Sequence, residues 1–257
     1  MARIQSLAVL ASGGGNDYLA ELYGAVIANI QKDGISNKVK NTALSGTPTS
    51  GTVEAKRFEN RTSNSYGTAR SGQAGQKVKA TPVVISINQD KELVTEIEQK
   101  DVSLYGIDAF LQKQAAMDEK SMLRELERAF WTEAQTAGTQ VQSLPTDPQE
   151  IAEKMIQSVE TVSNNFVDGV DRDMIALVCT PAFFGKLRTY LDTITNASGE
   201  EIGLYHGVKI FSSVYLPSTV TTCVAMAEGS VAQPILVNKV AGAGIPLSNA
   251  VATEIFY

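Results

Sequence analysis

The most restrictive feature of this 257-residue chain is a polar, basic stretch between Ser36 and Ala80. Its 45 residues include twelve Ser or Thr and five Gly, and they carry eight basic residues against two acids. The stretch therefore has a local charge of +6, whereas the whole chain has −6, which leaves −12 on the other 212 residues. A segment this long and polar gains too little burial to order itself within a compact domain. It is either a disordered insert or an arm whose partner is another molecule.

The pattern inside the stretch favours the arm. Thr52–Phe58 and Lys77–Ala80 alternate in polarity, and the residues between them, Asn60–Gln76, are rich in turn formers. Two strand-like legs around such a segment predict a long β-hairpin. Legs of about ten residues would project roughly 30 Å, at about 3.3 Å per residue. The more apolar Pro82–Ile87 follows and is predicted to enter a core.

Helical periodicity is strongest from about Asp108 to Ala137, where apolar residues recur at steps of three and four without Pro or Gly. This pattern predicts one helix of about 30 residues and roughly 45 Å. Apolar spacing from Leu19 to Ile30 predicts an earlier amphipathic helix, and the three glycines at 13–15 are interpreted as a flexible hinge before it. Leu93, Val94 and Ile97 also have helical spacing, within the charged segment 91–100.

The second half of the chain has the pattern of an α/β unit, over residues 147–235. A helix from Ile151, a buried strand at Met174–Cys179 and a short helix at 182–191 are predicted in that order. Further strands are expected at 208–211 and 221–227, a break at 242–244, and a terminal strand at 251–257. Residues 81–138 and 236–257 are expected to pair as a second layer.

The residues that usually carry catalysis are sparse. His206 is the one histidine, and its place before a glycine predicts a turn; Cys179 and Cys223 are far apart in sequence and suit buried thiols in a reducing cytosol. Ser12–Asn16 has glycines before a helix but lacks a phosphate-binding motif. We therefore predict no enzyme activity, no cofactor and no metal site. The acidic pI of about 5.0 argues against a nucleic-acid binder as a whole, and no apolar run approaches the length of a membrane span.

The order of these elements, together with several short phrases, resembles the major capsid proteins of tailed bacteriophages. The phrases are Gly51–Phe58, Thr180–Phe184, Gly207–Pro217 and Ala227–Ala232. The resemblance covers nearly the whole chain as an order of elements. It implies an α+β fold with an N-terminal arm, an extended β-hairpin called the E-loop, a peripheral (P) domain with a long spine helix, and an α/β axial (A) domain. The implied boundaries are 1–35 for the N-terminal arm and helix, 36–80 for the E-loop, 81–146 for the P-domain, 147–235 for the A-domain and 236–257 for a C-terminal return to the P-domain sheet.

By this resemblance the chain would assemble as hexamers and pentamers into an icosahedral shell around double-stranded phage DNA. The implied partners are further copies of the chain, a separate scaffolding protein, a portal and decoration proteins, with packaged DNA contacted weakly and non-specifically and no membrane. The location would be the virion capsid, assembled in the cytoplasm of a bacterial host. An encapsulin-type compartment, which shares the fold and encloses enzyme cargo, stays open. A small-molecule enzyme with a disordered insert and a tubular structural protein are alternatives of other classes.

A basic arm on an acidic body would also attract copies of the same chain to one another. We therefore expect contacts between subunits at two sets of residues. The E-loop set is Lys56, Arg57, Glu59, Arg61, Arg70, Lys77 and Lys79. The spine-helix set is Arg124, Glu127 and Arg128.

Overall fold

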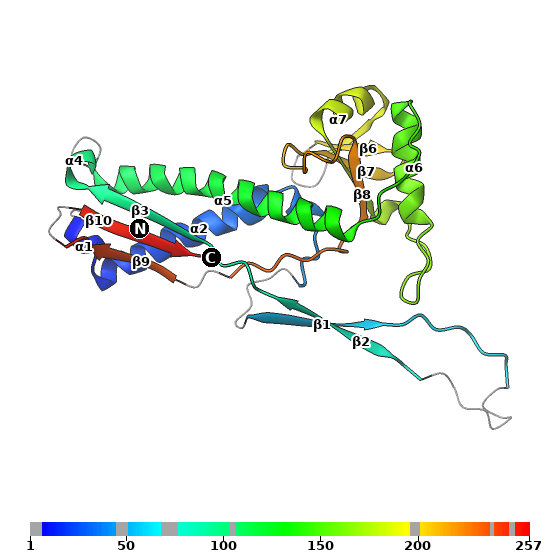
Figure 1. Cartoon of the computed structure of the whole chain (residues 1–257), viewed down its shortest axis with the longest axis horizontal. Helices are drawn as coiled ribbons and strands as arrows, with labels where there is room; N and C mark the ends of the chain where they lie inside the picture. Colours follow the sequence, from blue (N-terminus) through cyan, green and yellow to red (C-terminus); the bar gives the residue numbers. More distant parts are fainter. Residues whose placement is uncertain are drawn as a thin grey trace.

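A computed structural model describes residues 7–44, 51–67, 77–102, 106–195, 201–236, 239–246 and 250–257. The chain forms an elongated body, an α/β unit at one end of it, and an arm that projects beneath both (Figure 1). Helices and strands are both well represented, as the predicted α+β class requires. No helix among the described residues is long and apolar enough to cross a membrane.

The body consists of two long helices packed on a three-stranded antiparallel sheet of order β3-β10-β9. Its elements are α1 (Leu7–Leu10), α2 (Gly13–Asp33), β3 (Glu92–Glu98), α4 (Gln99–Val102), α5 (Ile107–Ala137), β9 (Lys239–Gly244) and β10 (Ala250–Phe256). Apolar residues of α2, α5 and the sheet form one buried cluster, which includes Leu19, Ile97, Leu111 and Ile255. The sheet brings the C-terminal strand beside β3, so residues more than 150 positions apart share this core.

The longest helix confirms its prediction, because α5 runs from Ile107 to Ala137 over 31 residues. Its N-terminal half buries Leu111 and Met122 in the body, and its C-terminal half buries Phe130 and Trp131 elsewhere. A single rigid helix therefore joins the body to the α/β unit (Figure 1).

The helix expected within residues 91–100 is wrong for most of its length, because Glu92–Glu98 is the strand β3. Leu93 and Ile97 face the core, whereas Val94 between them is 61% exposed. Pairing with β10 selects this period-two pattern over the helical spacing that the same apolar residues also satisfy.

Two glycine predictions are also corrected. Residues 13–15 are the first turn of α2 and not a hinge, with the amides of Gly15 and Asn16 bonded to the Ser12 carbonyl at 3.0 and 3.1 Å. The expected break at 242–244 belongs to strand β9. A Cβ atom at Gly242 would collide with the Leu10 carbonyl oxygen, so glycine is needed there for close packing against the N-terminal segment.

The α/β unit holds a five-stranded sheet of order β5-β6-β7-β4-β8, in which β4 runs parallel to β7 and antiparallel to β8. Its elements are α6 (Pro148–Glu160), η1 (Arg172–Met174), β4 (Ile175–Cys179), α7 (Pro181–Leu187), η2 (Arg188–Tyr190), β5 (Asp192–Thr195), β6 (Glu201–Tyr205), β7 (Val208–Ser212) and β8 (Cys223–Ala227). All five residues of β4 are buried, as its apolar run predicted. Strands β5 and β6 were not predicted, and α7 ends earlier than expected, at Leu187.

A separate buried cluster joins the body to the α/β unit. It contains Val39, Phe130, Trp131 and Met226, contributed by the start of the polar stretch, by α5 and by β8. Ser36–Val39 forms the short helix α3, in which Ser36 and Val39 are buried. The first part of the polar stretch is therefore packed against the protein and does not belong to the projecting arm.

The arm is the antiparallel hairpin of β1 (Thr52–Phe58) and β2 (Ala80–Ser86), with Thr52 opposite Ser86 and Phe58 opposite Ala80. The two-legged hairpin is confirmed for these strands, but the core strand expected at Pro82–Ile87 is wrong. Strand β2 pairs with β1 alone and is the returning leg, mostly exposed. The arm thus extends further along the sequence than the boundary at Ala80 implied.

Candidate assembly surfaces

The arm carries apolar side chains on both of its faces. On one face, Val53 and Ala55 of β1 lie opposite Ile85 and Val83 of β2, and all four are half-buried. The other face includes Phe58 and Val84, which are 62% and 58% exposed. A two-stranded ribbon is marginally stable by itself, and apolar surface of this kind usually marks a contact. In Figure 1 no helix of the body lies over the ribbon, and the face that carries Phe58 and Val84 is open to a partner.

The arm is attached to the α/β unit just beyond strand β1, through the loop between α6 and η1, residues 161–170. The backbone amide of Asn60 donates to the Asn165 carbonyl oxygen at 2.8 Å. With its amide oriented by the hydrogen-bond network, Asn60 also donates to the Phe166 carbonyl at 2.9 Å and accepts from the Val167 amide at 3.2 Å. The loop extends from the α/β unit toward the arm in Figure 1. Because these bonds hold the arm at a second point, they fix the direction in which the arm leaves the body.

Arg57 strengthens this attachment. Its guanidinium lies 4.2 Å from the centre of the Phe166 ring, a cation–π contact on the face of β1 that carries Val53 and Ala55. A cation with an aromatic partner inside its own subunit is less available to a neighbour. We therefore regard Arg57 as a residue that positions the arm, whatever else it contacts after assembly.

The other predicted arm residues are described only in part. Lys56 projects from the opposite face to Arg57 and is exposed, as are Arg61 and Lys77. Glu59 pairs with Lys79 across the hairpin at 3.6 Å, so these two charges partly neutralise each other. Arg70 lies outside the described residues. A role for this set in subunit contact stays a prediction.

The spine-helix set requires one correction. Glu127 is only 1% exposed, and both of its carboxylate oxygens are occupied inside the chain. Oε1 accepts from the Ser36 amide at 2.8 Å, and Oε2 accepts from Trp131 Nε1 at 2.8 Å. A carboxylate held in this way is not an external docking residue; it ties α3 to α5. Arg124 and Arg128 are exposed on α5, and their role stays a prediction.

Comparison with known proteins identifies the architecture. A search of protein-family models and of curated proteins gives no match. Among solved structures, a chain from Mycobacterium phage Che8 is 15% identical with a TM-score of 0.54. The alignment covers 100% of this chain and 86% of the Che8 chain. The holo-SrpI encapsulin complex of Synechococcus elongatus PCC 7942 gives 15% identity and a TM-score of 0.54, covering 90% and 88% of the two chains. The virus-like particle from Pyrococcus furiosus is 13% identical with a TM-score of 0.52, and the alignment covers 93% of this chain and 92% of the particle's chain.

The chain has the shell fold of phage capsid proteins and encapsulins. Because the alignment with the Che8 chain extends over all of this chain, the shell fold includes the arm and the α/β unit as well as the body. Sequence identity this low shows the fold alone.

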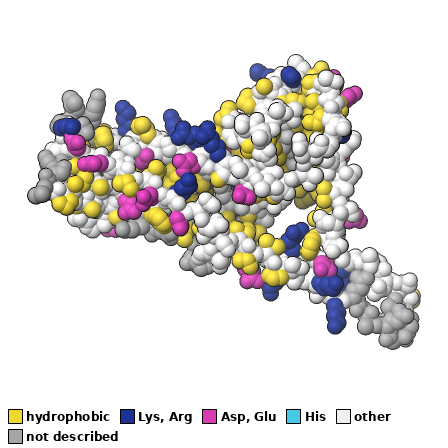
Figure 2. All heavy atoms as spheres, in the orientation of Figure 1, with side chains coloured by type: hydrophobic (Ala, Val, Ile, Leu, Met, Phe, Trp, Pro, Cys, Tyr) yellow, Lys and Arg dark blue, Asp and Glu magenta, His cyan; other side chains and the backbone are white. Residues whose placement is uncertain are grey.

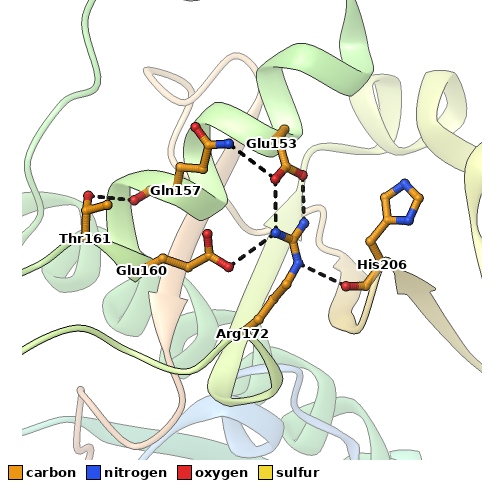
Figure 3. A network of polar contacts seen from close by, with 6 residues as sticks. All are labelled: Glu153, Gln157, Glu160, Thr161, Arg172 and His206. Atoms are coloured by element: carbon orange, nitrogen blue, oxygen red, sulfur yellow. Dashed lines mark hydrogen bonds and ion pairs between the residues drawn. The ribbon is translucent and has the colours of Figure 1, made fainter.

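Inside the α/β unit of this shell fold, Arg172 joins three elements (Figure 3). Its guanidinium donates to both oxygens of Glu153 on α6, at 3.0 and 2.7 Å, and to Glu160 on the same helix at 3.2 Å. Nε donates to the His206 carbonyl at 2.9 Å, in the turn between β6 and β7. The forked pair with Glu153 is the strong geometry for an Arg–carboxylate contact. Sequence reasoning missed this network, because no local pattern connects positions 153, 172 and 206.

The network predicts an acid-sensitive contribution to stability. The hydrogen bond from Arg172 holds the pKa of Glu153 below its usual value. A carboxyl whose folded pKa is depressed stabilises the fold above its unfolded pKa, and this contribution is lost as the pH falls through the folded value. At neutral pH, Arg172→Met should lower the free energy of unfolding by about 1 kcal/mol, since the group is only partly buried. The difference from wild type should shrink as the pH falls below the ordinary Glu pKa of about 4.3 and vanish once Glu153 is protonated in the folded state.

Denaturant unfolding at several pH values measures this difference. Arg188→Met removes an exposed arginine from the same unit and should change stability by less than about 0.5 kcal/mol. A constant Arg172→Met difference across the acid range would show that packing of the side chain, and not its charge, stabilises the unit.

The few chemically reactive residues take structural positions. His206 is exposed in a left-handed turn conformation, with φ 48° and Gly207 after it at φ 93°. Cys179 and Cys223 are buried, free and opposite each other on β4 and β8. A hydrogen bond between the two thiols, together with burial, raises the pKa of Cys179 and keeps it protonated. The part of the chain that the structure describes contains no cluster of three metal-ligating His, Cys, Asp or Glu residues.

The attachment of the arm to the loop at 161–170 is the contact that the sequence did not reveal. Ser163 to Asn165 and Gly169 are turn-forming residues, so a turn at this place was predictable in kind. Its partner was not, because Asn60 lies about a hundred positions earlier and nothing in either segment specifies the other.

Proposed function

We propose that this chain is a structural subunit of a closed protein shell built from many copies of itself. The observation that supports this most directly is the arm, a projecting hairpin with open apolar faces and a basic character, in a chain with a shell fold. The buried clusters of the subunit contain no residue of β1 or β2. The arm therefore adds little to the stability of its own subunit, and a neighbouring copy is the partner that would bury it.

In this proposal the arm docks on an acidic surface of the adjacent subunit. Exposed Lys56, Arg61 and Lys77, together with Arg70, would supply the positive charge, and Phe58 and Val84 the apolar contact. An exposed ion pair contributes only about 0–1 kcal/mol, but a shell repeats each contact in every copy. Arg124 and Arg128 of α5 were expected to add a second contact between subunits, and the docking of the arm does not require them.

We further propose that the copies form hexamers and pentamers of an icosahedral phage capsid enclosing double-stranded DNA. Assembly would take place in the host cytoplasm with a separate scaffolding protein, and the finished capsid would carry a portal and decoration proteins. The similarity to the encapsulin complex favours a second candidate, a bacterial compartment around protein cargo. Electron microscopy of the expressed protein, with and without a co-expressed scaffold, tests for closed particles. The contents of particles purified from the native source, DNA or an enzyme, distinguish the two candidates.

Reversing two charges of the arm tests the electrostatic part of the proposal. Lys56→Glu combined with Lys77→Glu should lower the yield of closed shells about tenfold or more, because each reversal replaces an attraction by a repulsion of roughly 1 kcal/mol. Shell yield is measured by sedimentation and electron microscopy. Higher salt should weaken assembly of the wild type toward that of the variant, since exposed charges are screened.

A matched control is Lys32→Glu with Lys186→Glu, which makes the same change in net charge at exposed positions of α2 and α7. This control should form shells in wild-type yield. Normal shells from the arm variant would refute electrostatic docking, and an equal loss in both variants would assign the effect to net charge alone.

A further inference from the structure

The basic residues of α5 are segregated on one side of the helix. All four of them lie within an arc of about 80° when residues advance by about 100° each. We call this set the basic stripe: Lys113, Lys120, Arg124 and Arg128. The six acids of the helix lie outside the arc: Asp108, Asp118, Glu119, Glu125, Glu127 and Glu133. The acid nearest to the arc is Glu127, which is buried and bonded inside the chain, so the exposed surface of the stripe has one sign.

The stripe is exposed, and its charges have no ion-pair partner among the residues that the structure describes. All four side chains are exposed, as are Ala116 and Met117 among them. Across the described residues, no ion pair involves any of the four. Figure 2 shows basic side chains along the edge of the body that α5 forms, with acidic side chains gathered below them. On the face drawn in Figure 2, most acidic side chains of the body thus lie below the basic ones.

The dimensions of the stripe match a regular polyanion. Fifteen residues separate its two ends, which corresponds to about 22 Å along a straight helix at about 1.5 Å per residue. One strand of a DNA duplex carries a phosphate about every 3.4 Å of the duplex axis, so roughly six phosphates lie within this length. Because the strand winds round the axis, about four of them can face the stripe. A protein partner would instead have to supply an equally long row of acids without intervening bases.

We propose that the basic stripe of α5 binds the phosphate backbone of double-stranded nucleic acid. The chemistry on the surface is ammonium and guanidinium groups with no base-reading element, so the contact is independent of sequence. The inference rests on the proposed function in one respect, because it places α5 on the side of the shell that faces the contents. A net charge of −6 on the chain keeps such a contact weak and sensitive to salt.

The test is fluorescence anisotropy of a short labelled duplex of mixed sequence, titrated with the purified, unassembled full-length chain. About four phosphate contacts predict that binding weakens roughly 100-fold between about 50 and 200 mM salt. The variant Lys113→Gln, Lys120→Gln, Arg124→Gln and Arg128→Gln should bind at least about 30-fold more weakly at the lower salt. It should also lose most of the salt dependence, since it releases few counterions.

The control variant changes four exposed cations away from the stripe: Lys32→Gln, Lys91→Gln, Lys186→Gln and Arg188→Gln. It makes the same change in net charge and should bind the duplex within about threefold of wild type. Equal binding by the two variants would overturn the proposal, because net charge alone would then explain the effect.

Shell yield of the same variants separates this inference from the proposed function. We expect the stripe variant to form shells in wild-type yield. If it binds the duplex like wild type but assembles poorly, the stripe is a contact between subunits and the nucleic-acid assignment is wrong. If the wild type itself forms no shell under any condition, the proposed function fails, while the duplex titration still decides whether the stripe binds phosphate.

Discussion

Glu127→Ala is expected to lower the free energy of unfolding by about 4 kcal/mol, the largest change in stability that we predict for one side chain. The substitution leaves the Ser36 amide and Trp131 Nε1 buried without their shared acceptor, and it opens a cavity at the centre of the joint between α3 and α5. Unsatisfied buried donors cost about 1–3 kcal/mol each, and breaking a buried charged contact typically costs about 3–5 kcal/mol in total. Burial lowers the pKa of nearby Lys40, whereas Glu127 raises it, so the substitution also removes a compensating charge.

Two further variants give this prediction its controls. Glu127→Gln keeps the volume of the side chain and one acceptor, but it turns an amide N–H toward a donor. The free energy of unfolding should therefore fall by about 2 kcal/mol. Glu133→Gln changes an exposed carboxylate on the same helix and should stay within about 0.5 kcal/mol of wild type. Trp131 is the single tryptophan, so its fluorescence reports unfolding at the site itself. A loss below about 1 kcal/mol for Glu127→Ala would mean that water replaces the carboxylate.

Shortening the arm is expected to abolish shell formation while leaving the subunit folded. In this variant an Asn-Gly turn replaces residues 60–78 and joins Glu59 directly to the start of the returning leg. Two-residue turns of this type close antiparallel hairpins with the right twist. The variant loses the tip of the arm and the Asn60 bonds to the loop at 161–170, but it retains β1, β2 and the Arg57 contact with Phe166. Because the buried clusters contain no residue of either strand, the free energy of unfolding should change by less than about 1 kcal/mol.

Sedimentation and electron microscopy measure the loss of shells, and Trp131 fluorescence measures the stability of the subunit. The shortened arm should reduce shell yield more than the two charge reversals, since it removes shape complementarity as well as charge. A full-length arm with Asn60→Ala is the control for the side-chain part of the intramolecular attachment, because it removes the two side-chain bonds to the loop and keeps the backbone bond to Asn165 and the Arg57 contact. It should retain some assembly. Shells of normal yield from the shortened chain would contradict a role for the arm tip in joining copies.

Helices and strands could be predicted from the sequence where the apolar pattern fits only one type of secondary structure. The long helix α5 has no Gly or Pro over 31 residues, and the five residues of β4 form an unbroken apolar run; both occur where expected. The segment of β3 allowed two interpretations, since Leu93 and Ile97 fit helical and alternating spacing alike. Its pairing with β10, about 150 residues away, decided between them. Distant pairing of this kind leaves no local trace.

The candidate surfaces were less predictable than the fold, for a related reason. Glu127 was assigned to the outer surface because charged neighbours flank it, although its spacing of three and four from Phe130 and Trp131 places it on the buried side. That signal was available in the sequence. The role of Arg57 depended on Phe166, and the need for Gly242 depended on Leu10, two contacts that exist only after folding.

The bonds between Asn60 and the loop at 161–170 have a consequence for the energetics of association. They hold the arm at a defined angle in the single subunit. The conformational entropy of the arm is therefore lost when the subunit folds and not when two copies associate. In the proposed shell, a prearranged arm would let individual contacts between copies remain weak while the closed particle is stable, because less ordering would oppose each step. Weak steps are reversible, and a misplaced copy can leave before the next one arrives.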